Sequence, residues 1–175
     1  LGSVKFKNYN KIDWSKVHIY NITIKKTPTN KYFASLCCEL RETDYIEPKF
    51  EACGFDLGIK DFAIFDTGEV IENPKYYRKT EYKIKKTQRV LSKCKKFSNN
   101  YKKVQLKIAK LHEKIKNQRK DFQHKLSRKI VNENQVIVSE DLNVKGMLKN
   151  HKLAKSIQDA SFSSFCNMIA YKASE

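Results

Sequence analysis

Long apolar runs are missing from this 175-residue sequence, and their absence excludes a membrane-spanning helix. A helix that crosses a bilayer needs about 20 consecutive, mostly apolar residues, and no stretch of the chain has that composition. Residues 1–5 contain neither an initiator Met nor the apolar core of a signal peptide. We therefore expect a soluble, cytoplasmic protein that is a piece of something longer.

Paired cysteine motifs are missing as well. The five cysteines are odd in number and never occur as C-x-x-C. The sequence therefore predicts neither a disulfide framework nor a zinc site. We expect reduced and mostly buried thiols.

Acidic residues are scarce in one segment, residues 75–129. That segment has 21 Lys and Arg residues against three acids, whereas the remainder of the chain has 15 against 16. The formal net charge of +17 therefore comes from one part of the chain. Such a block of charge is the usual footprint of a polyanion, nucleic acid first. It has few of the Trp and Phe anchors of a membrane-surface helix, so we predict no membrane partner.

A single carboxylate stands in the middle of an apolar stretch. We predict a central strand over residues 53–65, in which Asp56 lies between two glycines on the face opposite to Phe55 and Leu57. Glycine inside a strand admits the close approach of a ligand or another backbone, and a metal ion with a phosphate would need that space. The alternative is a solvated Asp on an edge strand, with Gly54 marking a bulge.

Further strands are predicted on both sides of this one. Residues 17–24 and 32–40 are rich in β-branched and aromatic side chains, and the turn residues 27–30 join them into a hairpin. The apolar face changes parity between Ile19 and Ile22, which indicates a bulge.

The strands that follow indicate a mixed sheet. After residues 53–65 the chain turns at 66–68 into an antiparallel strand over 69–72, and a short apolar strand over 136–143 ends in the carboxylates Glu140 and Asp141. A buried strand with an acid at its C-terminal end often presents a metal ligand. The alternative is that Asp141 or Asn143 caps the next turn.

The basic segment has helical periodicity. Apolar residues recur at spacings of three and four over residues 84–94 and again over 104–126, with a break at 98–100. We predict two long antiparallel helices whose other faces carry lysine, and a final helix over 156–173. The alternative for the pair is a solvated basic coiled coil, but its few acids leave self-repulsion unrelieved without a polyanion.

Specific residues follow from these elements. Asp56 and Glu140 are predicted to bind divalent metal, because two acids from strands of one sheet can share the ions that assist phosphodiester displacement. Mg²⁺ suits such a pair, since it binds through few carboxylates and keeps its waters. His112 and His124 are predicted at the surface or in contact with nucleic acid. The predicted nucleic-acid contacts are Lys60, Lys79, Lys86, Arg89, Lys103, Lys107, Lys110, Lys114, Arg119 and Lys120.

Four motifs resemble one protein family. They are GFDLGIKDF from Gly54, IENPKYYRK from Ile71, LHEKI with NQRKDF from Leu111, and EDLNVKGM from Glu140. In this order they resemble TnpB, the OrfB-type proteins of bacterial insertion sequences, which are related to the type V CRISPR effector nucleases. The resemblance covers most of residues 10–175.

The resemblance implies a fold and an activity. It implies an α/β (α+β) mixed sheet of the RNase H-like, RuvC type over residues 51–175, with a basic helical insertion at about 78–131. Residues 1–50 then form part of a wedge-type β-barrel. Asp56 and Glu140 match the first two catalytic acids of the family. Its members are RNA-guided, Mg²⁺-dependent DNA endonucleases of prokaryotes, so guide RNA and target DNA are the expected partners, Mn²⁺ a possible substitute ion, and the cytoplasm or nucleoid the expected place.

The chain also departs from the family pattern. Family members carry a recognition domain and the start of the barrel before this region, and a C-x-x-C zinc ribbon with a third catalytic Asp after it. This sequence contains none of these parts, so no zinc is expected in it. Asp159 could face the metal site from the last helix or lie at the surface.

The sequence therefore leaves three hypotheses about the function of the chain. The first is a metal-dependent nuclease that uses Asp56 and Glu140. The second is a binding module that holds RNA or DNA without cutting it. The third is a piece of a longer reading frame whose activity belongs to the parent protein.

Overall fold

Two units divide the chain, Leu1–Tyr45 and Ile46–Glu175. The computed structural model describes residues 5, 13, 17–39 and 47–174. Each unit is described by itself below.

The first unit contains a hairpin of two antiparallel strands, β1 (Ile19–Lys26) and β2 (Tyr32–Cys38). The pairing register shifts between Ile19 and Asn21, which confirms the predicted bulge. The predicted hairpin is confirmed over these strands. Its last predicted residue, Leu40, lies outside the described residues.

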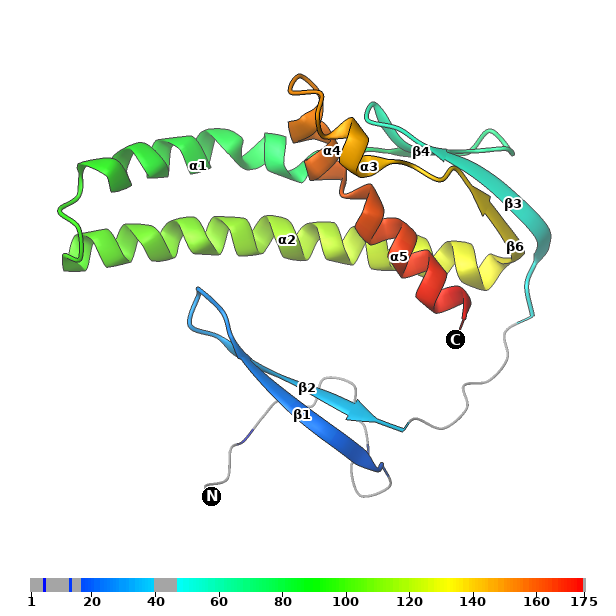
Figure 1. Ribbon diagram of the computed structural model, residues 1–175, viewed down its shortest axis with the longest axis horizontal. Helices are drawn as coiled ribbons and strands as arrows, with labels where there is room; N and C mark the ends of the chain where they lie inside the picture. The colour runs from blue at the N-terminus through cyan, green and yellow to red at the C-terminus, as the bar shows by residue number, and fades with distance from the viewer. Residues whose placement is uncertain (1–4, 6–12, 14–16, 40–46, 175) are drawn as a thin grey trace. The chain divides into compact units, whose positions relative to one another are not determined.

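The second unit is built on a four-stranded sheet. Its strands are β3 (Phe50–Leu57), β4 (Asp61–Phe65), β5 (Val70–Glu72) and β6 (Asn134–Ser139), in the order β5-β4-β3-β6. β4 pairs antiparallel with both β3 and β5, whereas β3 pairs parallel with β6. Parallel neighbours need a long crossover, which the helices between β5 and β6 supply (Figure 1). The predicted mixed sheet is confirmed.

The predicted continuous strand over residues 53–65 is wrong. β3 ends at Leu57, and the chain reverses so that Leu57 pairs with Ala63 of β4. Gly58 makes this reversal possible, because a Cβ atom there would lie 2.8 Å from the Asp61 carbonyl oxygen. The group that lies close to Gly58 is thus the backbone of Asp61. The edge-strand alternative for Asp56 is also wrong, since β3 lies between β4 and β6.

Two long helices form the predicted antiparallel pair (Figure 1). α1 spans Tyr76–Lys93 and α2 spans Asn99–Glu133. Ser98 caps α2, its hydroxyl oxygen accepting from the Tyr101 N–H at 3.1 Å. Side chains of the predicted apolar stripe, such as Ile84, are buried between the helices and the rest of the unit.

The predicted final helix is divided into two. After the short α3 (Val144–Met147), α4 spans Ala154–Ala160 and α5 spans Phe162–Ala173. Ser161 between α4 and α5 has a φ of 58°, in the left-handed region. The prediction of one helix over 156–173 is therefore wrong, because a left-handed residue ends α4.

The core lies between one face of the sheet and helices α2, α4 and α5. Phe62 of β4, and Phe162 and Phe165 of α5, are completely buried. The ring centroids of Phe62 and Phe165 are 5.0 Å apart in an edge-to-face arrangement, which favours aromatic pairs beyond their buried area. The helices thus cover one face of the sheet and leave the strand ends accessible.

The cysteines meet one expectation and contradict another. All five cysteines are free, as predicted, but Cys53 alone is buried, so the expectation of mostly buried thiols is wrong.

No described helix combines the length and the apolar composition needed to cross a membrane.

Candidate metal and nucleic-acid site

Asp56 and Glu140 lie at the same end of two neighbouring parallel strands. Phe55 of β3 pairs with Ser139 of β6, so each carboxylate stands one residue beyond this pair. Neighbouring strands are about 4.8 Å apart. The sheet therefore brings together two side chains that are 84 positions apart in the sequence.

Both carboxylates are exposed. Asp56 is exposed between the buried Phe55 and Leu57, which confirms the alternation predicted for this strand. Glu140 is exposed and lies two residues after Val138, which is 61% exposed. β6 ends at Ser139, and Glu140 is the residue that follows it.

Gly54 forms hydrogen bonds with a second acidic residue, Asp66. The Asp66 carboxylate accepts the Gly54 N–H at 2.8 Å, and the Asp66 N–H donates to the Gly54 carbonyl oxygen at 2.9 Å. A Cβ atom on Gly54 would lie 3.3 Å from that carboxylate oxygen. The sequence assigned Asp66 only to a turn, although an Asp at the start of a turn is a known acceptor for backbone N–H groups.

Asn143 takes the structural role that the sequence left open. Its side-chain oxygen accepts the Gly146 N–H at 2.9 Å and caps α3. The predicted cap and the metal hypothesis are compatible, because they use different residues: Glu140 stays exposed beyond β6.

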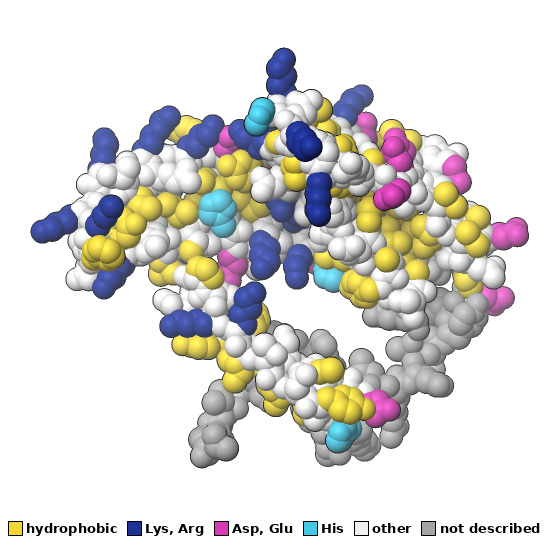
Figure 2. All heavy atoms as spheres, in the orientation of Figure 1, with side chains coloured by type: hydrophobic (Ala, Val, Ile, Leu, Met, Phe, Trp, Pro, Cys, Tyr) yellow, Lys and Arg dark blue, Asp and Glu magenta, His cyan; other side chains and the backbone are white. Residues whose placement is uncertain are grey.

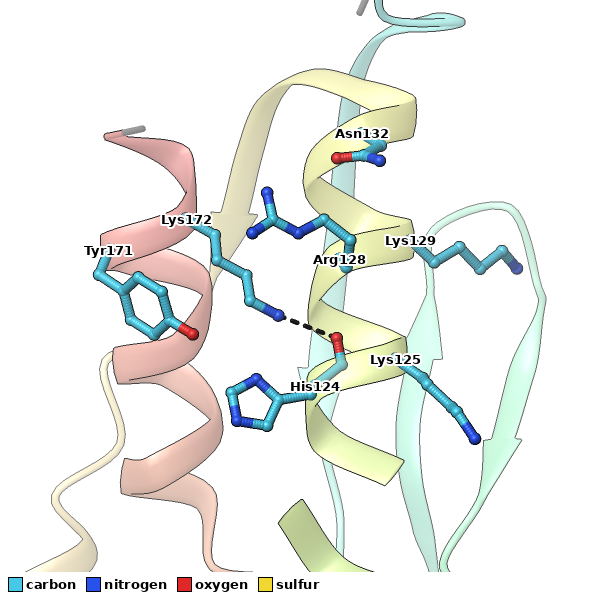
Figure 3. Close-up of a pocket in the computed structure, with 7 residues that line it drawn as sticks. All are labelled: His124, Lys125, Arg128, Lys129, Asn132, Tyr171 and Lys172. Atoms are coloured by element: carbon cyan, nitrogen blue, oxygen red, sulfur yellow. Dashed lines mark hydrogen bonds between the residues drawn. The ribbon is translucent and has the colours of Figure 1, made fainter. Parts of the chain in front are cut away.

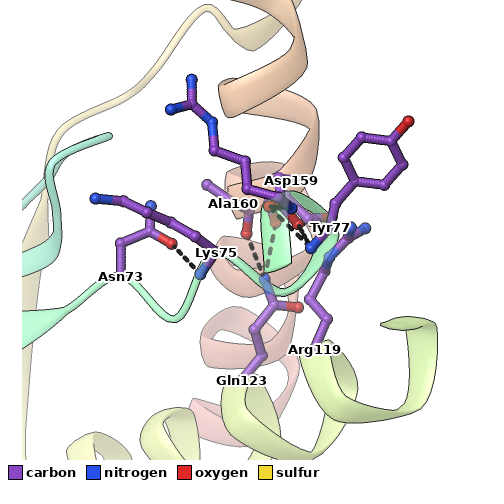
Figure 4. Close-up of polar contacts among 9 residues, drawn as sticks. Asn73, Lys75, Tyr77, Arg119, Gln123, Asp159 and Ala160 are labelled. Atoms are coloured by element: carbon purple, nitrogen blue, oxygen red, sulfur yellow. Dashed lines mark hydrogen bonds and ion pairs between the residues drawn. The ribbon is translucent and has the colours of Figure 1, made fainter. Parts of the chain in front are cut away.

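Asp159 lies in neither of the two places that the sequence suggested for it. It is buried, and its carboxylate accepts the backbone N–H of Tyr77 at 3.1 Å and of Arg78 at 3.4 Å (Figure 4). Arg119 of α2 completes the contact at 3.2 Å. Because the N-cap residue Lys75 makes no side-chain cap bond, Asp159 caps α1 from a distant part of the chain.

The site therefore contains two acids. Among the described residues, no group of three or more His, Cys, Asp and Glu side chains could hold a metal ion. Two exposed carboxylates supply the hard oxygen ligands that Mg²⁺ prefers, and leave coordination positions for water or phosphate. Chemically, the pair fits weak binding of a divalent ion at the open end of the sheet.

Positive charge covers the helical pair. Figure 2 shows Lys and Arg side chains gathered over the part of this face that α1 and α2 occupy. Of the ten predicted contacts, Arg119 is half-buried in its ion pair with Asp159, and the other nine are exposed. Exposure leaves these nine able to contact a partner, whereas Arg119 already has a structural role.

Two of the three acids of this segment form ion pairs. Glu81 accepts from Lys155 at 2.7 Å and from Lys85 at 2.8 Å. These two bonds lower the pKa of Glu81 to about 2. Asp121 similarly holds Lys125 at 2.8 Å. Such exposed pairs are individually weak, and most lysines of α1 and α2 remain available to a polyanion.

Comparisons with known proteins identify a family for this chain. The family model OrfB_IS605, described as "Probable transposase", matches residues 35–151. A protein of Streptomyces pristinaespiralis named "Putative RNA-guided DNA endonuclease" is 41% identical over 154 residues. InsQ of Escherichia coli K12, also named "Putative RNA-guided DNA endonuclease", is 31% identical over 150 residues.

Each alignment includes 86% of this chain but 37% and 36% of the two relatives. The chain thus spans about a third of the length of the curated relatives it matches. The matched region includes the strand with Asp56, both long helices and Glu140. By this match the chain belongs to the OrfB_IS605 transposase family, the family of TnpB.

Proposed function

We propose that this chain forms the metal-binding sheet and the nucleic-acid-binding helices of an RNA-guided DNA endonuclease. The observation that carries the proposal is the position of Asp56 and Glu140, side by side beyond the pair of Phe55 and Ser139. The names of the two relatives supply the substrate class. In this proposal the sheet β5-β4-β3-β6 is the first part of a RuvC-type, RNase H-like sheet.

The residues would act in three ways. Asp56 and Glu140 would hold Mg²⁺, with Mn²⁺ as a substitute, and orient it at the open end of the sheet. The ion, when bound, supplies electrostatic stabilisation of the charge that develops on phosphate oxygens. The exposed lysines of α1 and α2 would hold the guide RNA and the target DNA through their phosphates.

A binding module without cleavage is the second candidate. The observation that favours it is the lack of a three-ligand group among the described residues. Two carboxylates hold a metal ion more weakly than three and orient it less well. Both candidates predict binding that weakens steeply with salt, so only metal-dependent cleavage separates them.

The test measures cleavage and binding with one set of variants. Labelled single-stranded and duplex DNA are incubated with the chain in Mg²⁺ or Mn²⁺, with and without RNA. The variants are Asp56→Ala, Glu140→Ala and, as a matched control, Glu51→Ala, which removes an exposed carboxylate from the other end of β3.

The outcomes distinguish the candidates. Nuclease function predicts metal-dependent cutting by the wild type and Glu51→Ala that disappears in Asp56→Ala and Glu140→Ala. Binding without cutting in every variant favours the binding module. Cutting that survives both site variants would overturn the assignment of the acids.

A further inference from the structure

The two most exposed large apolar side chains of the described residues are aromatic, and both belong to the basic segment. Phe97 is 83% exposed and Tyr82 is 74% exposed. Within the part of the chain that the structure describes, neither ring contacts another ring. Single exposed apolar side chains are common on protein surfaces, so the surroundings of these two rings decide whether they have a role.

Tyr82 lies in a row of basic residues on the outer face of α1. Five exposed side chains recur along this face at spacings of three and four, and we call them the α1 stripe: Lys79, Tyr82, Lys86, Arg89 and Lys93. The buried residues of the helix, Ile84 and Thr87, lie on the opposite face. The side chains of the α1 stripe therefore share one side of the helix and point away from the core.

Ion pairs do not neutralise the charges of the α1 stripe. Among the described residues, none of its four cations has a carboxylate partner. Glu81 is the one acid of α1, and it binds Lys85 at 2.8 Å and Lys155 at 2.7 Å instead. The α1 stripe therefore presents positive charge beside an exposed aromatic ring.

Other basic side chains of this unit have structural partners. In the depression between α2 and α5, the Lys172 ammonium donates to the His124 carbonyl oxygen at 2.9 Å (Figure 3). Lys129 of α2 binds Glu69 at 2.9 Å. Cations that hold elements of the fold together in this way are less available to a partner than those of the α1 stripe.

Phe97 follows the α1 stripe in the turn between α1 and α2. Its backbone has a φ of 65°, in the left-handed region, which a residue with a bulky side chain occupies only at a cost in stability. Burial of the ring does not offset this cost, because the ring is exposed. The exposed Lys95 and Lys96 precede it. Strained positions of this kind concentrate at binding sites, so the ring of Phe97 is better explained by binding than by folding.

We propose that the α1 stripe and Phe97 bind single-stranded nucleic acid, with the rings of Tyr82 and Phe97 stacked on unpaired bases. Lys86, Arg89 and Lys93 lie between the two rings in the sequence and bind the phosphates. The helix rises about 10 Å from Lys86 to Lys93, a length over which a stacked strand has about three phosphates. The proposal rests on the proposed function in taking nucleic acid as the ligand, and it adds the form of the strand and the two stacking residues.

Exposed rings favour an unpaired strand over a duplex. The bases of a duplex are paired and stacked on one another, so their faces are closed to a ring on a helix surface. Every base of a single strand offers such a face. A membrane surface would instead require an apolar face opposite the charges, whereas Tyr82 lies within the row of charges and the apolar face of α1 is buried.

The test separates stacking from charge. Fluorescence anisotropy without divalent metal measures the affinity and its salt dependence for labelled oligo(dT), for an abasic strand of the same length and for duplex DNA. The abasic strand keeps the phosphates and lacks the bases. Vesicles of phosphatidylcholine and phosphatidylserine are the membrane probe.

The variants remove or keep one ring at a time. They are Tyr82→Ala, Phe97→Ala and Phe97→Tyr, which retains an aromatic ring. Val90→Ala is the matched control, because it removes an exposed apolar side chain of the same helix that has no ring. Arg89→Gln removes one charge of the α1 stripe.

Tyr82→Ala and Phe97→Ala should each weaken oligo(dT) binding about tenfold. Their salt slopes and their affinities for the abasic strand and the duplex should stay those of the wild type. Phe97→Tyr and Val90→Ala should bind oligo(dT) as the wild type does. Arg89→Gln should instead lower the salt slope by about 0.7 for both single strands, one phosphate contact.

Three results would overturn the proposal. Equal oligo(dT) affinities of Val90→Ala and the two ring-to-Ala variants would exclude the rings as contacts. An equal loss on the abasic strand would mean that the variants do not act through stacking. Vesicle binding that depends on Phe97, with oligo(dT) binding unchanged, would assign the ring to a membrane surface. Failure of the proposed function is separate, since it appears as absent metal-dependent cleavage and leaves these metal-free affinities unaffected.

Discussion

The Arg119 guanidinium contacts the Asp159 carboxylate at 3.2 Å, and this ion pair joins α2 to the beginning of α1 through α4 (Figure 4). Asp159 has 5% of its side-chain surface exposed and Arg119 has 24%. A buried carboxylate with these partners stabilises the packing of α1, α2 and α4. It is therefore unavailable as a third metal ligand beside Asp56 and Glu140.

Replacement of Asp159 should destabilise the protein. Asp159→Ala leaves two backbone N–H groups and a guanidinium without their acceptor, and we expect a loss of about 3 kcal/mol in the free energy of unfolding. Asp159→Asn should lose less, since its amide oxygen still accepts from the N–H groups. Urea unfolding measures both, with the exposed Asp141→Ala as control. Equal stability of the Asp159 and Asp141 variants would contradict the capping role.

The two glycines around Asp56 should respond differently to a methyl group. Gly58→Ala places a Cβ atom 2.8 Å from the Asp61 carbonyl oxygen, and the backbone must move, at a cost of about 1–3 kcal/mol. Gly54→Ala meets the Asp66 side-chain oxygen at 3.3 Å. Because that carboxylate is on an exposed side chain, it can shift, and we expect a smaller loss. Thermal unfolding compares the two variants, and an equal or reversed order would refute this account of Gly58.

Local patterns predicted the elements that carry the candidate site. Alternation around Asp56 placed Phe55 and Leu57 in the core, and helical spacing predicted α1 and α2. Asp56 and Glu140 are adjacent because β3 pairs parallel with β6. The metal hypothesis suggested that the two acids lie together, but no local sequence pattern predicts which strands pair.

Long-range contacts account for the wrong boundaries. Ser161 has no glycine or proline beside it to signal a break. Instead, the buried Gln123 amide donates to the Ala160 carbonyl oxygen at 2.9 Å and to that of Ser161 at 3.1 Å, which satisfies the carbonyls at the end of α4. The role of Asp159 likewise depends on Tyr77, 82 positions away. The spacing of apolar and polar residues along the chain does not predict such contacts.

Charge reversal on one face of α2 should weaken nucleic-acid binding strongly. Lys103, Lys107, Lys110 and Lys114 are exposed and recur at spacings of four and three, so they share one face. Their replacement by Glu should lower affinity for duplex and flatten the salt dependence, by about 0.9 in slope for each lost phosphate contact. Replacement of the same four residues by Arg retains the charge and serves as the control. Unchanged duplex binding by the Glu variant would remove this face as a contact surface.

Stability should fall in mild acid because of His124. The folded-state pKa of His124 is lowered by burial and by Lys172, Lys120 and Arg128, with Asp121 opposing. The unfolded chain, with a pKa of about 6.5, therefore takes up a proton first as the pH falls. This contribution to stability is fully present above that pKa and is lost as the pH falls through the folded-state value.

Unfolding experiments from pH 8 to pH 5 (about the range in which histidine titrates) check this contribution by comparing variants. His124→Gln should lose less stability between these limits than the wild type, because glutamine has no proton to gain. Arg128→Gln should also lose less, since removing one cation moves the pKa of His124 back toward its ordinary value. If all three proteins lose stability in parallel, the positive charges of Lys172, Lys120 and Arg128 do not act on His124 as the structure indicates.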